Sequence, residues 1–383
     1  MSIPSGHWRR PACSTGCAFC NNTRWLSTLA CYKPAVTRII KSAFEADVRN
    51  KEFQMSKRFA AVIVGICMTW AGHAGSTWVA RAQAPTPAPA PAAATPRPNP
   101  QGGTGAIKVA LITKGHAYDR EGLNLLFDSL GEDVSWSHVE HPAASLLWDP
   151  KSAGLFDVFV FFDAPGRQQR KSASGAITYD DPGPDAKKNL PALMQAGTKG
   201  WVFLHHAIAS WNHTWPEYSE MVGGACDWGN PVTFRGKEFP NSGAQGGVKQ
   251  RINVVDKAHP ITQGLGDGFD IVDETYLCPY ADEAVQPLLR TDFKPVDVNF
   301  PGRYAKGWRH SEGSNLAGWV KVAGRSPIAY LQNGHDRQAW ENPAYRTMLL
   351  NAIRWAASKE SKTWAAANAK TGTPVAWRPA GTN

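Results

Sequence analysis

The sequence predicts an α/β protein of three layers, with a mostly parallel central sheet and a strand-rich second half. Strand-like and helix-like segments alternate through the first half, which is typical of a parallel sheet covered by helices. Residues 158–162 are apolar without interruption, as in a central parallel strand that is buried on both faces. A hydrophobic fraction of 43% is ample for one large core.

Each element follows from its local pattern. In the first half we expect strands at 107–113, 134–139, 157–162 and 200–205, with helices at 120–130 and 186–195. In the second half we expect strands at 249–256, 269–277, 285–291, 316–322 and 326–332. An amphipathic helix at 343–357 closes the pattern. Right-handed crossovers between the first strands would give a doubly wound sheet.

The positive charge of the chain is concentrated at the N-terminus. Residues 1–84 hold 11 of the 41 Lys and Arg residues but only three of the 32 Asp and Glu residues. The other 299 residues therefore carry 30 basic and 29 acidic side chains and are almost neutral. This balance predicts no phosphate-binding surface, so nucleic acid is not an expected partner.

The N-terminal segment has the marks of export. A basic head after Met55, an apolar run of about 14 residues and an Ala-x-Ala ending predict a cleaved signal peptide at 55–84, with an uncleaved N-terminal anchor as the alternative. Residues 1–54 would then be an upstream over-extension of the reading frame, and 85–104 a Pro/Ala-rich linker. We expect a periplasmic or extracellular protein that has no stable membrane span after cleavage.

The cysteines give two signals of different weight. Cys13, Cys17 and Cys20 have the spacing of a radical S-adenosylmethionine cluster site, but the signal peptide that follows argues against a cluster. After the linker only Cys226 and Cys278 remain. They could pair in an oxidising compartment, and the sequence leaves this open.

Several separated motifs together resemble the ThuA-like (trehalose-utilisation) family over roughly residues 107–357. The motifs are Leu204-His205-His206-Ala207, Trp211, Trp215, Tyr218, Met221 to Gly224, Asp256, His259 to Thr262, Gly264-Leu265, Asp273-Glu274, Tyr276, Gly334-His335-Asp336, Trp340, Asn342-Pro343, Asn351 to Ile353 and Trp355-Ala356. The resemblance implies a flavodoxin-like sandwich similar to class I glutamine amidotransferases, and a role in sugar metabolism. We therefore expect one domain at 105–358 and a loose tail at 359–383.

The sequence departs from the amidotransferase pattern at the nucleophile. That fold carries a cysteine on a tight turn after a central strand, whereas this turn reads His205-His206-Ala207. Ser210 lies too far along to replace the cysteine. Glutaminase chemistry through a thiolate is therefore not expected.

Polar residues at the ends of the expected strands are the candidates for chemistry. Parallel strands deliver their carboxyl ends to one edge of a sheet, where ligands bind. We expect His335, Glu274, His116 and His206 to act as catalytic residues. His335 lies where the resemblance places a catalytic histidine. His205 and His206 should face opposite sides if the chain is extended there, so at most one would reach the cleft.

Other candidates concern substrate and metal. Substrate could contact Asp163, Tyr276, Trp211, Trp215 and Trp340, although the indoles suit core packing equally well. His205, His206, Glu274 and His335 could hold a divalent ion such as Zn²⁺. Asp273 should face away from Glu274 and bind backbone, and His259 should be structural.

Two classes of function are consistent with these residues. One is an enzyme that acts on a carbohydrate or keto-sugar derivative by His/Glu acid–base or metal-assisted chemistry, in the manner of a hydrolase or lyase. The alternative is a non-catalytic sugar-binding or accessory domain on the same fold. In both cases the expected partner is a small carbohydrate, and the oligomeric state stays open.

Overall fold

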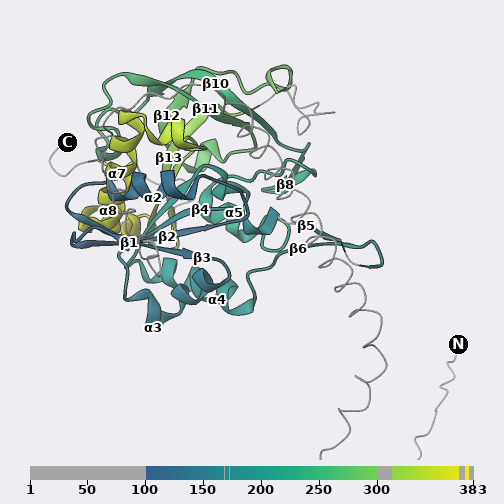
Figure 1. Cartoon of the computed structure of the whole chain (residues 1–383), viewed down its shortest axis with the longest axis horizontal. Coiled ribbons are helices and arrows are strands. Elements are labelled where there is room, and N and C mark those ends of the chain that lie inside the picture. The colour runs from purple at the N-terminus through teal and green to yellow at the C-terminus, as the bar shows by residue number, and fades with distance from the viewer. Residues whose placement is uncertain (1–100, 168, 172, 301–312, 371–375, 379–383) are drawn as a thin grey trace, which may run out of the picture. The chain divides into compact units, whose positions relative to one another are not determined.

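Five parallel strands form the centre of a ten-stranded sheet in the computed structural model (Figure 1). Their spatial order is β3 (Val134–Glu140), β2 (Ile107–Lys114), β4 (Val158–Asp163), β7 (Gly200–Leu204) and β14 (Ser326–Leu331). Numbered along the chain, this is the order 2-1-3-4-5 of flavodoxin-like folds. The expected fold class is confirmed.

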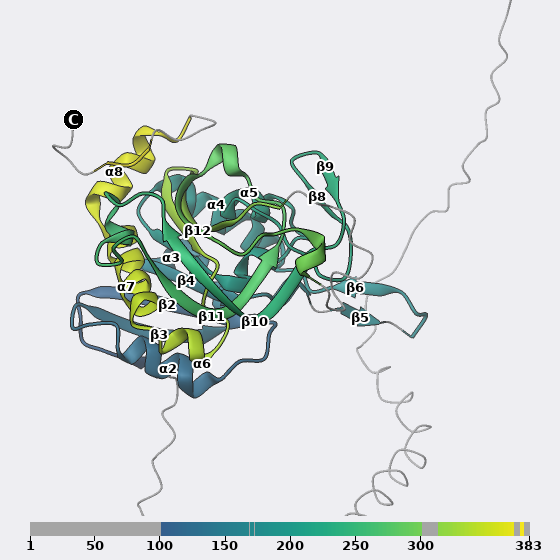
Figure 2. The ribbon, with the colours of Figure 1, turned by 90° about the horizontal axis from the view of Figure 1, so that it is seen from above.

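The strand-rich second half extends this sheet with antiparallel strands. Beyond β14 lie β13 (Leu316–Ala323), β12 (Gln286–Thr291), β10 (Gly243–Val254) and β11 (Gly268–Leu277). β10 begins six residues earlier than expected, since a bulge between Gln245 and Val248 lets the strand continue through two glycines. Figure 2 also shows two small hairpins beside the sheet, β5 (Gln169–Lys171) with β6 (Ile177–Tyr179) and β8 (Val232–Phe234) with β9 (Lys237–Phe239).

The structure describes residues 101–167, 169–171, 173–300, 313–370 and 376–378. The predictions for 1–54, the signal peptide, most of the linker and the cysteine triplet lie outside these residues. The last part of the expected linker is not free chain, because Gln101 and Gly102 form β1, which pairs with the edge strand β3. Among the helices of the described residues, none has the length and apolar character needed to cross a bilayer.

Helices cover both faces of the sheet and make the outer layers (Figure 1). One face packs against α2 (Arg120–Asp128), α6 (Arg337–Trp340), α7 (Pro343–Ala357) and α8 (Lys359–Ala367). The other packs against α3 (Pro150–Ala153), α4 (Pro184–Ala196) and α5 (Glu217–Val222). Strand alternation divides the core: Val109 and Leu111 of β2 face the first set, Ala110 and Ile112 the second.

Short 3₁₀ helices occupy several connections. They are η1 (Ala143–Trp148), η2 (Pro165–Arg167), η3 (His205–Ala209), η4 (Pro260–Thr262), η5 (Asp282–Ala284) and η6 (Asp297–Asn299). The most important for the site is η3, because it begins directly at the end of the central strand β7.

The C-terminal tail is more ordered than expected. Residues 359–367 form α8, whose Ala365 is buried, and Trp377 is buried against the same core as α7. The backbone N–H of Trp377 donates to Gln286 of β12. The expectation of a loose tail at 359–383 is therefore wrong for these residues, because burial of the indole outweighs the weak apolar character of the segment.

His259 is a structural residue, as expected. Its Nδ1 accepts from the N–H of Ile261 at 3.2 Å, and so caps η4. The ring lies between Trp355 and Trp377, with ring centroids 5.1 and 4.9 Å away. Burial disfavours the charged imidazole and lowers the pKa of His259 to about 3.

This burial predicts a stability that depends on pH. Above pH 6.5 the ring is neutral in both states. Below pH 6.5 the ring of His259 is protonated in the unfolded chain, but in the folded chain it stays neutral until the pH falls to about 3. The free energy of unfolding therefore decreases as the pH drops. Between pH 6.5 and 5 the loss should be about 2 kcal/mol. Urea unfolding at pH 7 and pH 5 measures it. His259→Asn keeps a capping acceptor without the titration and should lose about 2 kcal/mol less; equal losses would contradict the prediction.

Candidate functional site

Side chains from four separate segments meet at the carboxyl ends of the parallel strands. His205 follows β7, His335 follows β14, Glu274 lies in β11 and His116 follows β2. His335 Nδ1 lies 3.3 Å from Glu274 Oε2 and 2.9 Å from His205 Nε2. The ring of His116 lies 5.3 Å from that of His335, centroid to centroid. We call His205, Glu274 and His335 the central cluster.

The turn after β7 brings two adjacent histidines to the site. His205 has a φ of 50°, in the left-handed region, so the alternation expected for an extended chain stops there. The rings of His205 and His206 lie 5.3 Å apart, and both are buried. His206 packs on Phe162 and lies 4.9 Å from the ring of His116. The turn begins at His205 itself, so the alternation of an extended chain does not apply: His205 enters the central cluster, and His206 packs beside it.

His205 is the most enclosed member of the central cluster. Its Nδ1 lies 2.7 Å from the backbone carbonyl oxygen of Gln332, which can only accept, so Nδ1 carries the hydrogen. Its Nε2 faces Glu274 Oε2 at 3.1 Å and the hydroxyl of Tyr276 at 2.6 Å. Tyr276, expected to bind substrate, is buried and contacts His205.

Asp273 holds the loop that carries His335. Its carboxylate accepts hydrogen bonds from the N–H groups of Gly334 and His335, at 2.7 and 3.1 Å, and from the side chain of Asn333. Burial raises its pKa. Strand alternation turns Asp273 away from Glu274, so its expected backbone role is confirmed.

Removing this acceptor should cost stability. Asp273→Asn keeps the size of the side chain but turns one accepting oxygen into a donor opposite buried N–H groups. We expect the free energy of unfolding to fall by about 2–3 kcal/mol, measured by urea unfolding. Asp270→Asn, at an exposed position of the same strand, is the matched control and should change stability by less than about 0.5 kcal/mol. A similar loss in both variants would contradict this role.

The electrostatics of the central cluster favour an ionised carboxylate beside a histidine. Burial opposes the charge on Glu274, but hydrogen bonds and charge from His205 and His335 outweigh burial and lower the pKa of Glu274. Burial likewise opposes the charged ring of His335, yet Glu274 outweighs it and raises the pKa of His335. The two shifts have opposite signs, as in an ion pair.

Two glycines allow the close approach of the loops. Gly115 has a φ of 88° and Gly334 a φ of 114°. A Cβ atom would lie 2.1 Å from the carbonyl oxygen of Ala164 at the first position and 2.2 Å from the hydroxyl of Tyr345 at the second. Each glycine precedes a site histidine, so a Gly-His pair after a strand was a usable signal in the sequence.

The structure places four other expected substrate residues in the packed interior. Asp163 is fully buried and pairs with His141 at 3.0 Å, on the sheet face opposite to Phe162. Trp211 packs on His141 and Trp215 on Tyr218. Trp340 is also buried, and its indole N–H donates to the carbonyl oxygen of Gly334 at 2.8 Å. Their expected contact with substrate is corrected to packing, since burial leaves neither the carboxylate of Asp163 nor the faces of the three indoles open to a sugar.

Two residues of the site had no signal in the sequence. Gln332 contributes a backbone carbonyl, which any residue type could supply. Phe162 supports the ring of His206, with centroids 4.4 Å apart, but in the sequence it reads as one more apolar residue of a core strand.

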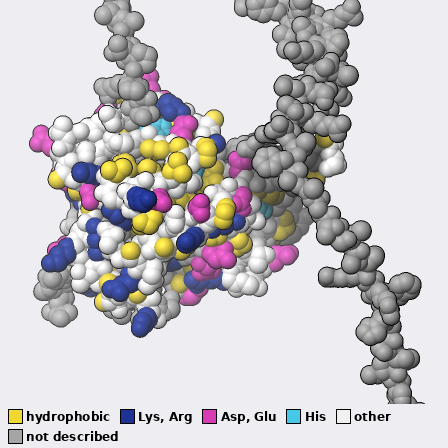
Figure 3. Space-filling model, turned by 90° about the horizontal axis from the view of Figure 1, so that it is seen from below, with side chains coloured by type: hydrophobic (Ala, Val, Ile, Leu, Met, Phe, Trp, Pro, Cys, Tyr) yellow, Lys and Arg dark blue, Asp and Glu magenta, His cyan; other side chains and the backbone are white. Residues whose placement is uncertain are grey.

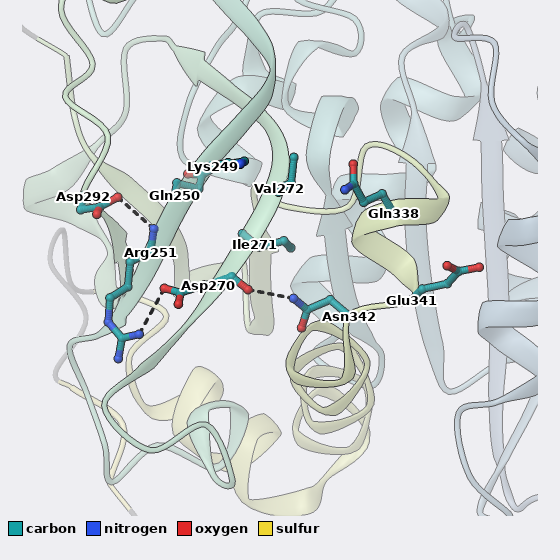
Figure 4. A pocket seen from close by; sticks show the side chains of 10 residues that line it. All are labelled: Lys249, Gln250, Arg251, Asp270, Ile271, Val272, Asp292, Gln338, Glu341 and Asn342. Carbon is teal, nitrogen blue, oxygen red and sulfur yellow. Dashed lines mark hydrogen bonds and ion pairs between the residues drawn. The ribbon is translucent and has the colours of Figure 1, made fainter.

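A polar groove of 640 Å³ lies away from the central cluster, between β10, β11 and α6. Figure 4 shows two contacts within it: the guanidinium of Arg251 reaches Asp270, and the Arg251 backbone N–H donates to Asp292. The side-chain amide of Asn342, which also lines the groove, donates to the backbone carbonyl oxygen of Asp270. On the face in Figure 3, basic and acidic side chains are interspersed. We assign neither surface a ligand.

The turn after β7 carries no nucleophile of the amidotransferase type. Histidines occupy it, and the hydroxyl of Ser210 donates to the carbonyl oxygen of Asp163 at 2.7 Å. Cys226 and Cys278, the only cysteines of the described residues, form a disulfide with a Cα–Cα distance of 5.3 Å. A thiolate is thus absent from the described part of the chain, in agreement with the sequence prediction.

Fold and site define a flavodoxin-like α/β protein with a histidine–carboxylate site in place of the amidotransferase cysteine. The family model described as ThuA, trehalose utilisation, matches residues 156–356, more than half of the chain. The chain belongs to the ThuA family. The matched range includes His205, Glu274 and His335 but not His116.

Solved structures give distant similarities. A ThuA-like protein from Parabacteroides merdae is 17% identical, with a TM-score of 0.47, over 66% of this chain and 90% of that one. A ThuA-like protein from Bacteroides uniformis is 19% identical, with a TM-score of 0.45, over 71% and 96%. PurLQS from Thermotoga maritima is 10% identical, with a TM-score of 0.38, over 65% and 98%. No curated protein matches this sequence.

Proposed function

We propose that this ThuA-family protein is an enzyme that acts on carbohydrates or on their keto derivatives. The observation that carries the proposal is the central cluster, where His335 Nδ1 lies 3.3 Å from Glu274 Oε2 at the strand ends. The described family role in trehalose utilisation supports a sugar as the substrate class. Glutaminase chemistry is not proposed, because the turn lacks its nucleophile.

The cluster has the parts for acid–base chemistry. His205 is fully buried, whereas the side chains of His335 and Glu274 are 28% and 18% exposed, so a substrate can approach these two. The carboxylate of Glu274 can accept a proton and the imidazole of His335 can donate one, and their reacting atoms lie 3.3 Å apart. A hydrolase or a lyase acting on a sugar needs both. His116, which is partly exposed beside His335, could orient a hydroxyl group.

The test is turnover on a substrate panel. The purified protein is incubated with mono- and disaccharides, trehalose included, and with their keto derivatives, and products are followed by chromatography and NMR. We expect turnover of at least one member of the panel, lost in Glu274→Gln. Saturable sugar binding without turnover would overturn the enzyme and support the accessory-domain alternative.

We also propose that the protein is exported to the periplasm or beyond. Support comes from the signal-like pattern at 55–84 and from the Cys226–Cys278 disulfide, which is typical of oxidising compartments. N-terminal sequencing of the native protein should find a start near Pro85. Peptides from residues 1–54 in the mature protein would contradict export by this signal.

A further inference from the structure

We infer that the central cluster is a binding site for one divalent transition-metal ion, with His205 Nε2, His335 Nδ1 and Glu274 Oε2 as ligands. The three atoms are separated from one another by 2.9, 3.1 and 3.3 Å. Ligands that bind one ion at about 2.0–2.1 Å, with angles between 90° and 110°, are about 2.9–3.4 Å apart. The side chains therefore already stand at the spacing of three ligands of one ion.

The ligand atoms of the central cluster can direct their lone pairs to one position, where a cation would be stabilised. Nδ1 of His205 carries a hydrogen, so in the neutral ring its Nε2 presents a lone pair. This lone pair faces an oxygen of Glu274, which accepts only, at 3.1 Å. The hydroxyl of Tyr276, 2.6 Å from the same nitrogen, can donate to it, but the oxygen of Glu274 cannot, so the contact between His205 and Glu274 needs a shared proton or a metal ion between the two atoms. Nδ1 of His335 points to the same place, which suits an ion that can bind all three atoms at once.

Groups behind the ligands hold them in position. Metal-binding histidines usually donate their second N–H to a carbonyl or carboxylate, and His205 donates to the carbonyl oxygen of Gln332 at 2.7 Å. Asp273 fixes the backbone of His335 through two N–H groups. His205 adopts a left-handed conformation, with a φ of 50°, and such strain is typical of functional sites.

The ligand set indicates the kind of ion. Two imidazole nitrogens and one carboxylate suit zinc and its transition-metal neighbours, whereas magnesium and calcium prefer oxygen ligands. Three protein ligands leave a position for substrate or water, as in catalytic zinc sites. An ion here would act as a Lewis acid on a sugar oxygen. The role of the ion rests on the proposed function, but its binding rests on geometry alone.

His206 is not part of the ligand set. Among the described residues, only His205, Glu274 and His335 bring three ligand atoms within 4.8 Å of one another at this site. The ring of His206 packs on Phe162 and beside His116 instead. The structure therefore corrects the expectation that His206 could bind the ion: His206 lies next to the site but is not one of its ligands.

The test is metal binding by the mature protein, purified without a polyhistidine tag. After treatment with a chelator, the protein is titrated with Zn²⁺ by calorimetry and with Co²⁺ by visible absorption. We expect one ion per chain with micromolar or tighter affinity, and a rise of the melting temperature on addition of Zn²⁺. In Glu274→Gln and His335→Gln, affinity should fall by at least 10-fold.

His213→Gln is the matched control, since His213 also pairs with a carboxylate, Asp227, outside the central cluster. It should bind both ions as the parent does, and circular dichroism of all variants reports folding. Absence of binding in the parent, or loss of binding only in His213→Gln, would overturn the inference. Sugar turnover that persists after chelation would overturn the Lewis-acid role of the ion and leave the proposed function standing. One bound ion per chain without turnover of any sugar would support the metal site and overturn the proposed function.

Discussion

Under the proposed function, Glu274→Gln is expected to lower kcat/KM for the substrate found in the panel by about 10²–10⁴-fold, or about 3–5 kcal/mol of transition-state stabilisation. The amide has nearly the shape of the carboxylate, so the fold should persist. However, it cannot take up a proton at neutral pH, and it leaves His335 without its charged partner at 3.3 Å. Steady-state kinetics on the substrate identified from the panel measures the effect.

Controls separate chemistry from folding. Glu238→Gln, an exposed residue of β9, makes the same chemical change away from the site and should retain activity within about twofold. His335→Gln should fall into the range of Glu274→Gln. The double variant should lose little more than the worse single variant, because residues that act as one unit are not additive. Activity of Glu274→Gln within 10-fold of the parent would exclude this carboxylate from catalysis.

Loss of the Cys226–Cys278 disulfide is expected to lower the free energy of unfolding by about 4 kcal/mol. The bridge joins residues 52 positions apart, and the loop-closure entropy of the unfolded chain gives a value of that order. It also connects the segment after α5 to the end of β11, where Tyr276 contacts both His205 and Trp228. Reduction should therefore weaken the support of the site as well as the fold.

Urea unfolding with and without reductant measures this loss. The double variant Cys226→Ser and Cys278→Ser should match the reduced parent and show no response to reductant. A parent whose stability is the same in both states would contradict the expected contribution. If the reduced protein stays folded, its affinity for Zn²⁺ shows whether the support of the central cluster depends on the bridge.

Local patterns determined most of the fold. Continuous apolar runs marked the buried parallel strands, and β4 is buried at every position from Val158 to Asp163. The alternation of strand and helix, together with the right-handed crossover rule, leaves few topologies other than a doubly wound sheet. The two-residue strand β1 and helix α8 escaped prediction, because their order comes from pairing and burial against distant segments.

The sequence by itself determined that His116, His205 and His335, which follow parallel strands, meet at one edge of the sheet, because parallel strands share their direction. Glu274 joins them from within the antiparallel strand β11, and strand direction alone does not give this placement. Only the tertiary structure decided which side chains touch. The left-handed turn at His205 brings two adjacent histidines to the site, and burial removes Asp163 and Trp211 from it. Such outcomes depend on a single backbone dihedral and on packing between segments more than 100 residues apart, as in the bond from His205 to the Gln332 carbonyl, and a local sequence pattern does not encode them.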